Sequence, residues 1–317
     1  MKFSKLQASG NDFVLIDVES VGLEVLLDSI STLARSMCQH RFGIGADGLI
    51  LVQKSQVADL KMRIYNPDGS EAEACGNGLR CAVKYAIEYS VNQPLHHPEL
   101  GAENLSRPSS TSTVTIETLS GIRQAKAYVS EKEVRRVEVK MGKPQFQPEQ
   151  IPVDLTQTIS LEARGPVANE AEQSPILNYT VTVKGRELAL SLLSMGNPHA
   201  VAFLSQPLAK FPLARVGPVV ERHSIFPQRT NFEIARVLGK GKIEARVWER
   251  GVGETLSCGS GACAIAVAAQ LAGYAGKEVD IIFPGGILTV FYNGVGEVLL
   301  TGSVDEVFTG EWLENHV

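Results

Sequence analysis

Two stretches of this 317-residue chain repeat one another, and this repeat constrains the fold more than any other feature. "EAEACGNGLRCA" surrounds Cys75 and "GETLSCGSGACA" surrounds Cys258, with two glycines at the same places after each cysteine. An acidic residue, Glu71 or Glu254, lies four residues before each cysteine. A repeat of this kind predicts two copies of one structural unit.

Further matches extend the repeat in both directions. Asn66 of "YNPDG" and Glu249 of "WERGVG" each lie nine residues before their cysteine. Upstream, "SGNDFVL" corresponds to "MGNPHAV", and downstream, "VTIETLSGI" corresponds to "VDIIFPGGI". Because these anchors occur in one order, we predict a duplicated α/β unit whose two halves face each other.

The local patterns fit such a unit. Helices are predicted to begin at the glycine-rich turns and to cover residues 76–90 and 259–273. The second is apolar on all sides, which indicates a helix surrounded by protein, as in a sheet wrapped around a central helix. Alternating runs such as "STVTIETL", "VRRVEVKM", "NYTVTVKG" and "IEARVWER" predict strands. Two polar, turn-rich stretches, 90–112 and 162–178, read as surface insertions.

The fold class is therefore α/β, with two pseudosymmetric domains that arise from an internal duplication. We expect an N-terminal half at 1–133, joined by the C-terminal segment 303–317, and a C-terminal half at 134–302. A chain of this length also exceeds what one hydrophobic core usually supports.

Composition excludes several function classes. The 30 basic and 35 acidic residues give a net charge of −5, so there is no electrostatic reason to expect nucleic acid or an anionic membrane as partner. No apolar run approaches the roughly 18 residues of a membrane span. The N-terminus reads as a strand and not as a signal peptide, which favours a cytoplasmic protein, or an organellar one if a transit peptide was removed.

The cysteines are better candidates for chemistry than for cross-links or metal. Five cysteines is an odd number in a chain without a secretion signal, so a disulfide framework is not expected. Their spacing also lacks the short pairs of a zinc site, and we predict no metal. Cys38, Cys81 and Cys263 keep the ordinary interpretation of buried free cysteines that pack like small apolar residues.

Cys75 and Cys258 are different because each precedes a helix. Unpaired N–H groups and the helix dipole favour negative charge there, so we expect a lowered thiol pKa and a small anion site made by the following glycines. Facing halves would place one thiol on either side of a ligand. That geometry suits removal of a proton from one face of a carbon next to a carboxylate and its return to the other face.

Other motifs in the sequence fit known sites less well. A cysteine nucleophile would need a histidine base, for which His199 of "MGNPHAV" is the candidate. "ACGNGLRC" lacks the spacing of a Walker phosphate loop, and "FGIGADG" at 42–48 is more typical of a turn than of a dinucleotide site. A matched pair of cysteine motifs favours the two-base interpretation.

Seven segments together resemble the diaminopimelate epimerase family. They are "SGNDFVLID", "RFGIGADG", "YNPDGSEAEACGNGLRCA", "GNPHAV", "RTNFE", "WERGVGETLSCGSGACA" and "FPGG", and they extend from residue 9 to residue 286. The resemblance implies a cofactor-independent epimerase that interconverts LL- and meso-diaminopimelate, on the route to lysine and peptidoglycan. It also implies two α/β domains, each a sheet around a central helix, with the active site in the cleft between them.

The resemblance also implies roles for particular residues. Cys75 and Cys258 would be the two acid–base thiols. Cys75 would deliver the proton on one face while Cys258 abstracts it on the other, and the two would exchange roles in the reverse reaction. His199 would tune the cysteine chemistry, and Glu249 and Arg250 would bind the ammonium and carboxylate groups of the substrate. The reacting carboxylate would be held by Gly76, Asn77, Gly259 and Ser260, and the substrate-binding asparagines would be Asn11, Asn66, Asn197 and Asn231.

One position departs from the family pattern, because some members carry Gln where Gly48 stands. Two alternatives remain open: a proline-racemase-like enzyme, and a non-catalytic module that binds an amino acid. The expected partner is the small molecule diaminopimelate, with no cofactor, nucleic acid or membrane. A homodimer is compatible with the sequence, which does not determine the oligomeric state.

Overall fold

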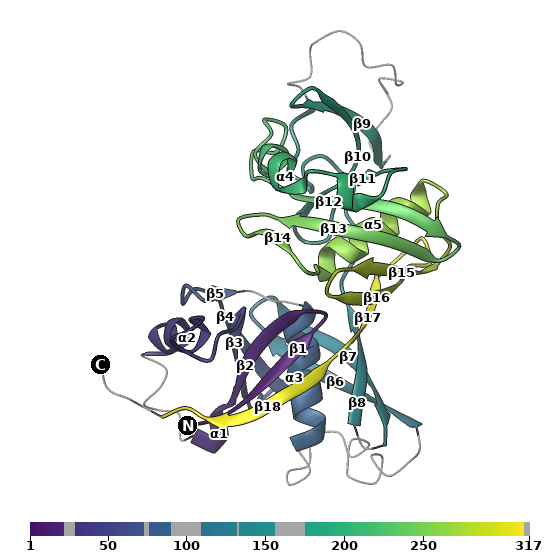
Figure 1. The fold of residues 1–317 in the computed structure, drawn as a ribbon. Coiled ribbons are helices and arrows are strands. Elements are labelled where there is room, and N and C mark those ends of the chain that lie inside the picture. Colours follow the sequence, from purple (N-terminus) through teal and green to yellow (C-terminus); the bar gives the residue numbers. More distant parts are fainter. Residues whose placement is uncertain (22–28, 73–75, 90–108, 132, 156–174, 314–317) are drawn as a thin grey trace. The chain divides into compact units, whose positions relative to one another are not determined.

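The computed structural model describes residues 1–21, 29–72, 76–89, 109–131, 133–155 and 175–313 (Figure 1). Contacts divide the chain into two compact units. Unit 1 contains residues 1–140 and 301–317, and unit 2 contains residues 141–300. The sequence placed these divisions at residues 133 and 302.

Unit 1 contains strands and helices in the following order. They are β1 (Lys2–Ala8), β2 (Asn11–Asp17), α1 (Val18–Val21), α2 (Ile30–Cys38), β3 (Gly48–Gln53), β4 (Leu60–Tyr65), β5 (Glu71–Ala72), α3 (Gly76–Tyr89), β6 (Ser109–Thr118), β7 (Gly121–Ser130), β8 (Glu133–Lys140) and β18 (Asp305–Glu311). The C-terminal strand β18 pairs antiparallel with β1, so the chain returns to the unit in which it began.

After an additional first strand, unit 2 repeats most of this order. Its elements are β9 (Ile176–Val183), β10 (Arg186–Ser194), β11 (Pro198–Phe203), a 3₁₀ helix (Leu208–Lys210), α4 (Leu213–Glu221), β12 (Asn231–Gly239), β13 (Lys242–Glu249), β14 (Gly253–Thr255), α5 (Gly259–Leu271), β15 (Glu278–Phe283) and β16 (Gly286–Phe291). Strand β17 (Leu299–Ser303) lies at the boundary between the units.

The two units share one strand topology. In unit 1, β1 and β2 pair antiparallel, β2 and β3 parallel, β3 and β4 antiparallel, and β4 and β6 parallel. In unit 2 the same sequence of pairings joins β10 with β11, β11 with β12, β12 with β13, and β13 with β15. The mixed sheets and the duplication that the sequence predicts are therefore confirmed.

The repeat also holds without gaps over a long stretch. Helices α2 and α4, strands β3 and β12, and helices α3 and α5 begin 183 residues apart, at residues 30 and 213, 48 and 231, and 76 and 259. The same offset relates two ion pairs. Arg63 contacts Glu71 with Nε–Oε1 at 2.7 Å, and Arg246 contacts Glu254 with Nε–Oε1 at 2.9 Å. Each pair joins a strand to the short strand that leads to the cysteine loop.

Each unit has a helix at its centre. α3 packs against β1, β2, β3, β4, β7 and β8, and α5 packs against β10, β11, β12, β15 and β16. All residues from Gly261 to Ala269 are buried, which agrees with the apolar sequence of α5. Alanine at five of these nine positions lets the surrounding strands approach the helix closely.

The sequence analysis missed α2 and α4, which have nine residues each, and α4 contains Pro218 in its interior. Short helices give little periodic signal, and proline argues against a helix. The two predicted insertions, 90–112 and 162–178, extend too far at their C-terminal ends, because β6 begins at Ser109 and β9 at Ile176. Residues 90–108 and 156–174 lie outside the described part of the chain.

The core around α5 gives a first prediction. Ile265 is fully buried in α5, whereas Leu271 at its end is 39% exposed. We expect Ile265→Ala to lower the free energy of unfolding by about 2–5 kcal/mol, because it leaves a cavity. Leu271→Ala is the matched control and should cost less than about 1 kcal/mol. Equal losses in urea denaturation would contradict the central position of α5.

Candidate functional site

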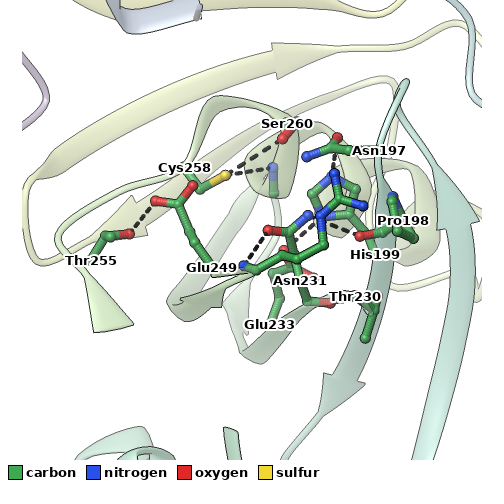
Figure 2. A network of polar contacts seen from close by, with 12 residues as sticks. Asn197, Pro198, His199, Thr230, Asn231, Glu233, Glu249, Thr255, Cys258 and Ser260 are labelled. Carbon is green, nitrogen blue, oxygen red and sulfur yellow. Dashed lines mark hydrogen bonds and ion pairs between the residues drawn. The ribbon is translucent and has the colours of Figure 1, made fainter. Parts of the chain in front are cut away.

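Cys258 is the N-terminal cap of α5 (Figure 2). Its backbone is extended, with φ −138° and ψ 122°, and its Sγ accepts a hydrogen bond from the Gly261 N–H at 3.4 Å. Ser260 Oγ lies 3.5 Å from the same sulfur. Serine, threonine or aspartate usually occupies this position, because a side-chain acceptor there satisfies an unpaired N–H of the first turn. A buried thiol takes their place here.

The surroundings of Cys258 raise the pKa of its thiol well above the ordinary value. Burial is the main cause, and the carboxylates of Glu249 and Glu233 add to it. The hydrogen bonds from Ser260 and Gly261 act in the opposite direction but are weaker. The expectation of a lowered pKa is thus wrong for Cys258, because desolvation and two nearby carboxylates outweigh the helix end. At neutral pH this residue is a protonated thiol.

Glu249 lies beside this thiol at the end of β13. Its Oε1 accepts a hydrogen bond of 2.5 Å from Thr255 Oγ1, and the carboxylate also accepts one from Cys258. Burial raises the pKa of Glu249, and these two hydrogen bonds oppose the rise. A carboxyl group with a raised pKa next to a thiol is suited to exchange a proton with it.

His199 is completely buried on β11 and continues the polar network. Its Nδ1 lies 2.7 Å from Glu233 Oε1, and its Nε2 lies 2.9 Å from Asn197 Oδ1. The parallel register of β11 and β12 pairs His199 with Asn231, and Glu233 follows two residues later on the same face. Because both ring nitrogens face oxygen acceptors, a proton on each nitrogen satisfies both contacts.

Both the nitrogen and the oxygen of the Asn231 side-chain amide form hydrogen bonds. Its Nδ2 donates to the Pro198 carbonyl at 2.9 Å, and its Oδ1 accepts from the Arg250 backbone N–H at 2.9 Å. Arg250 is exposed, and its Nη1 donates to the Gln228 carbonyl at 3.2 Å. Asn231 therefore holds the backbone of the predicted carboxylate-binding arginine and has one amide hydrogen left for another acceptor.

Unit 1 brings two other predicted residues together. Asn77 Nδ2 in the first turn of α3 donates to Asn11 Oδ1 at 2.8 Å, and Asn11 Nδ2 donates to Asp47 Oδ2 at 2.9 Å. Asn77 is 3% exposed, and its Oδ1 has no hydrogen-bond partner among the residues that the structure describes. A donor on a bound molecule is the natural partner for such an oxygen.

The remaining predicted positions are local to each unit. Asn66 is exposed in the turn after β4, where its Nδ2 donates to Ser70 Oγ at 3.0 Å. Gly76 and Gly259 begin α3 and α5, as predicted. Cys75 lies outside the described residues. Gly48 admits no side chain, because a Cβ there would lie 2.9 Å from the Tyr65 carbonyl oxygen.

Sequence reasoning missed two carboxylates that support the network. Glu233 lies in the quoted motif "RTNFE", and a signal was available, since a glutamate inside an apolar strand is uncommon. Asp47 lies in "GADG", where it reads as an ordinary turn residue. Across the described ranges, no group of three or more His, Cys, Asp or Glu side chains could hold a metal ion. No helix in these ranges is long and apolar enough to cross a membrane.

Comparison with known proteins identifies a family. The family model described as diaminopimelate epimerase matches residues 3–147 and 191–307. A diaminopimelate epimerase of Moorella thermoacetica is 40% identical over 313 residues, which cover 98% of this chain and 99% of that protein. The corresponding protein of Desulfovibrio desulfuricans is 38% identical over 313 residues and 98% of both chains.

Solved structures share the fold at much lower sequence identity. A phenazine biosynthesis protein of the PhzF family from Bacillus anthracis is 15% identical with a TM-score of 0.62, over 99% of both chains. A hydroxyproline epimerase from Agrobacterium vitis is 15% identical with a TM-score of 0.62, over 98% of this chain and 90% of the other. At these identities the likeness concerns the fold alone.

The tight packing at Gly261 gives a second prediction. A Cβ at this position would lie 2.9 Å from Glu233 Oε1 and 3.2 Å from Cys258 Cβ. At an exposed position inside a helix, replacing glycine by alanine stabilises the folded protein by about 1 kcal/mol. We expect Gly261→Ala to lower the free energy of unfolding instead. Gly239→Ala, where nothing lies within 4 Å of the added carbon, is the control. A stabilised Gly261→Ala protein would contradict the packing described.

The raised pKa of Glu249 gives a third prediction. The folded protein holds the proton of Glu249 more tightly than the unfolded chain does. Ionisation of Glu249 therefore costs stability as the pH rises from its ordinary pKa of 4.5 through its folded value. We expect Glu249→Gln to be more stable than the wild type at pH 7, with a difference that shrinks as the pH falls through the raised folded value toward 4.5.

Urea denaturation between pH 4 and pH 7 measures this difference. Glu278→Gln is the control, since Glu278 is exposed and its replacement should change the free energy of unfolding by less than about 0.5 kcal/mol. A Glu249→Gln protein that is less stable than the wild type at pH 7 would contradict the prediction.

Proposed function

The chain belongs to the diaminopimelate epimerase family, and we propose that it interconverts LL- and meso-diaminopimelate by moving a proton off and onto Cα without a cofactor. Both isomers carry two amino-acid heads, and the reaction inverts the Cα of one of them. The observation that carries the proposal is the buried Cys258 thiol at the start of α5, in hydrogen-bond contact with Glu249.

The chemistry requires one proton donor and one base. In one direction, a thiolate at Cys75 takes the Cα proton and the electron pair remains on Cα, delocalised into the carboxylate. Cys258 then gives its proton to the opposite face, so that one C–H bond breaks and one forms. The raised pKa of Cys258 supports its role as the donor at the start of this direction, and the roles exchange in reverse.

The substrate carboxylate needs donors that stabilise the developing negative charge. The first turn of α5, with Gly259 and Ser260, supplies backbone N–H groups and a hydroxyl beside the thiol. Gly76 and Asn77 supply the equivalent turn of α3 in unit 1. Preorganised donors of this kind usually provide the largest share of rate enhancement, about 10²–10³ for each donor removed.

The second amino-acid head distinguishes diaminopimelate from simpler amino acids. Arg250 is exposed, and its backbone is fixed by Asn231, so its guanidinium is suited to bind the distal carboxylate. We assign the other substrate contacts to Asn11, Asn66, Asn197 and Asn231. The second head gives the Glu249–Arg250 pair a group to bind. A proline-racemase-like enzyme or a non-catalytic module would not need this pair.

Glu249 and His199 would set the protonation of the site. Glu249 exchanges a proton with the Cys258 thiol through their hydrogen bond. His199 contacts the Glu233 carboxylate through Nδ1 and so ties it into the same network. The remaining parts of the proposal are a cytoplasmic location, a role in making lysine and peptidoglycan precursors, a homodimer, and no nucleic-acid or membrane partner.

A deuterium-exchange experiment tests the proposed function. Wild-type protein with LL-diaminopimelate in D₂O, without pyridoxal phosphate, should incorporate deuterium at Cα and form the meso isomer. Cys75→Ala and Cys258→Ala should each lower the rate of epimerisation by about 10²–10⁴-fold or more, the usual effect of losing an acid–base group. NMR and chiral chromatography measure the two products.

Cys263→Ala is the matched control, because Cys263 lies in α5, the helix that Cys258 caps, and is fully buried. It should retain exchange. Absence of exchange in the wild type would refute the enzyme assignment. Exchange with proline but not with diaminopimelate would move the chain to the racemase alternative.

A further inference from the structure

The buried carboxylate of Glu221, on α4, accepts hydrogen bonds from both sides of the turn that carries Glu249 and Arg250. Glu221 Oε2 accepts a hydrogen bond of 2.8 Å from Trp248 Nε1, and its Oε1 accepts one of 3.1 Å from the Gly251 backbone N–H. Glu221 is only 3% exposed. Its two donors come from the residues that immediately flank the Glu249–Arg250 pair.

We propose that Glu221 is a positioning residue that holds the Glu249–Arg250 turn in the geometry needed for catalysis and substrate binding. This inference rests on the proposed function and assigns a role to a residue that lies outside the predicted site. Among the described residues, the side-chain hydrogen bonds of Glu221 go to Trp248 and Gly251, which are neither the thiol nor residues assigned to the substrate. It acts through the backbone and through the Trp248 side chain.

The packing of α4 explains why Glu221 reaches this turn. Gly217, one helical turn earlier, lies against the Trp248 ring so closely that a Cβ would be 2.6 Å from it. This contact brings α4 and β13 together and fixes the indole. Arg229 Nη1 lies 3.7 Å from Glu221 Oε1 and offsets part of its charge. A buried carboxylate needs such donors, because an unpaired one is costly.

A second tether acts from the other side of the turn. Asn231 Oδ1 accepts from the Arg250 N–H at 2.9 Å, and Val252 N–H closes the turn onto the Glu249 carbonyl at 3.1 Å. Two consecutive backbone N–H groups, those of Arg250 and Gly251, are thus each held by a buried side chain. The orientation of the two charged side chains between Trp248 and Gly251 depends on both.

The repeat shows that this carboxylate is specific to unit 2. At the 183-residue offset, Cys38 stands in unit 1 where Glu221 stands in unit 2, and Tyr65 stands where Trp248 stands. The Tyr65 hydroxyl is buried and has no hydrogen-bond partner among the described residues. Unit 1 steadies its own turn differently, through Arg35 Nη1, which donates to the Asp68 carbonyl at 2.8 Å.

The difference matches what each turn carries. The turn of unit 1 carries Asn66 and the exposed Asp68, and the exposed Arg35 donates to the Asp68 carbonyl from outside the turn. The turn of unit 2 carries two charged residues, one of them beside the Cys258 thiol, and a buried carboxylate supports it with two hydrogen bonds. The buried carboxylate is thus found beside the turn that holds the residue in contact with the Cys258 thiol.

Glu221→Gln tests the role, because both oxygens of Glu221 act as acceptors. A glutamine can accept from Gly251 only by turning its NH₂ group toward the Trp248 N–H, so that two donors face each other. We expect kcat/KM for LL-diaminopimelate to fall about tenfold or more, with a rise in KM, because Arg250 is displaced. We also expect faster hydrogen exchange of the Gly251 amide, measured by NMR.

Trp248→Phe supplies the rescue. It removes the second donor while keeping an aromatic ring against Gly217, so Glu221→Gln/Trp248→Phe has no donor–donor contact. We expect the double variant to recover activity relative to Glu221→Gln, to within about threefold of Trp248→Phe alone. Arg35→Gln is the counterpart in unit 1, and its effect should be smaller because one exposed hydrogen bond is lost.

The outcomes separate this inference from the proposed function. If the wild type epimerises and Glu221→Gln keeps the same kcat and KM, the positioning role is overturned while the function stands. A fall in kcat alone that matches the loss of folded protein in circular dichroism also overturns it, since that is a structural effect. If the wild type does not epimerise diaminopimelate, the proposed function fails, and the positioning role fails with it.

Discussion

The burial of the Cys258 thiol at the start of α5 is the constraint on which the rest of unit 2 depends. A helix beginning favours a negative charge, but desolvation and the carboxylates of Glu249 and Glu233 oppose it, so the thiol keeps its proton. Because the site lies in a low-dielectric core, each surrounding polar group needs a partner. The contacts of His199, Asn231 and Thr255 satisfy that need and thereby fix the positions of the groups proposed to react.

The duplication supplies two equal backbones and two unequal chemical environments. Where unit 2 has the His199–Glu233 pair, the same strands of unit 1 carry Phe13 and Ile50. Where unit 2 has Glu249 and Thr255, unit 1 has Asn66 and Ala72 at the same offset. His199, Glu233 and Glu249 of unit 2 therefore have counterparts in unit 1 that do not titrate. A two-base reaction uses one thiol and one thiolate, and two identical halves would not distinguish them.

The sequence predicted the elements that the duplicated backbone repeats. It did not predict properties that depend on the three-dimensional surroundings of a residue. α3 and α5 were predictable because glycines mark their beginnings and their apolar residues recur in sequence. The repeat itself was predictable from a few residues around Cys75 and Cys258. The raised pKa of Cys258 was not, because it depends on a depth of burial and on carboxylates from two other strands. Glu221 was also invisible, since its role arises only when α4, a helix with an internal proline, is folded against β13.

The buried carboxylates of unit 2 show how stability and chemistry are balanced in one core. Glu221 is satisfied by two donors and holds a turn in place, so its burial serves the fold as well as the site. Glu249 has a raised pKa and lies where its charge is disfavoured, which is a cost to the folded state that a neutral side chain would avoid. That cost is useful only if the carboxyl gains and loses a proton during turnover. A buried carboxyl group with a raised pKa beside a thiol, on a turn held from both sides, fits the proton transfer proposed for it.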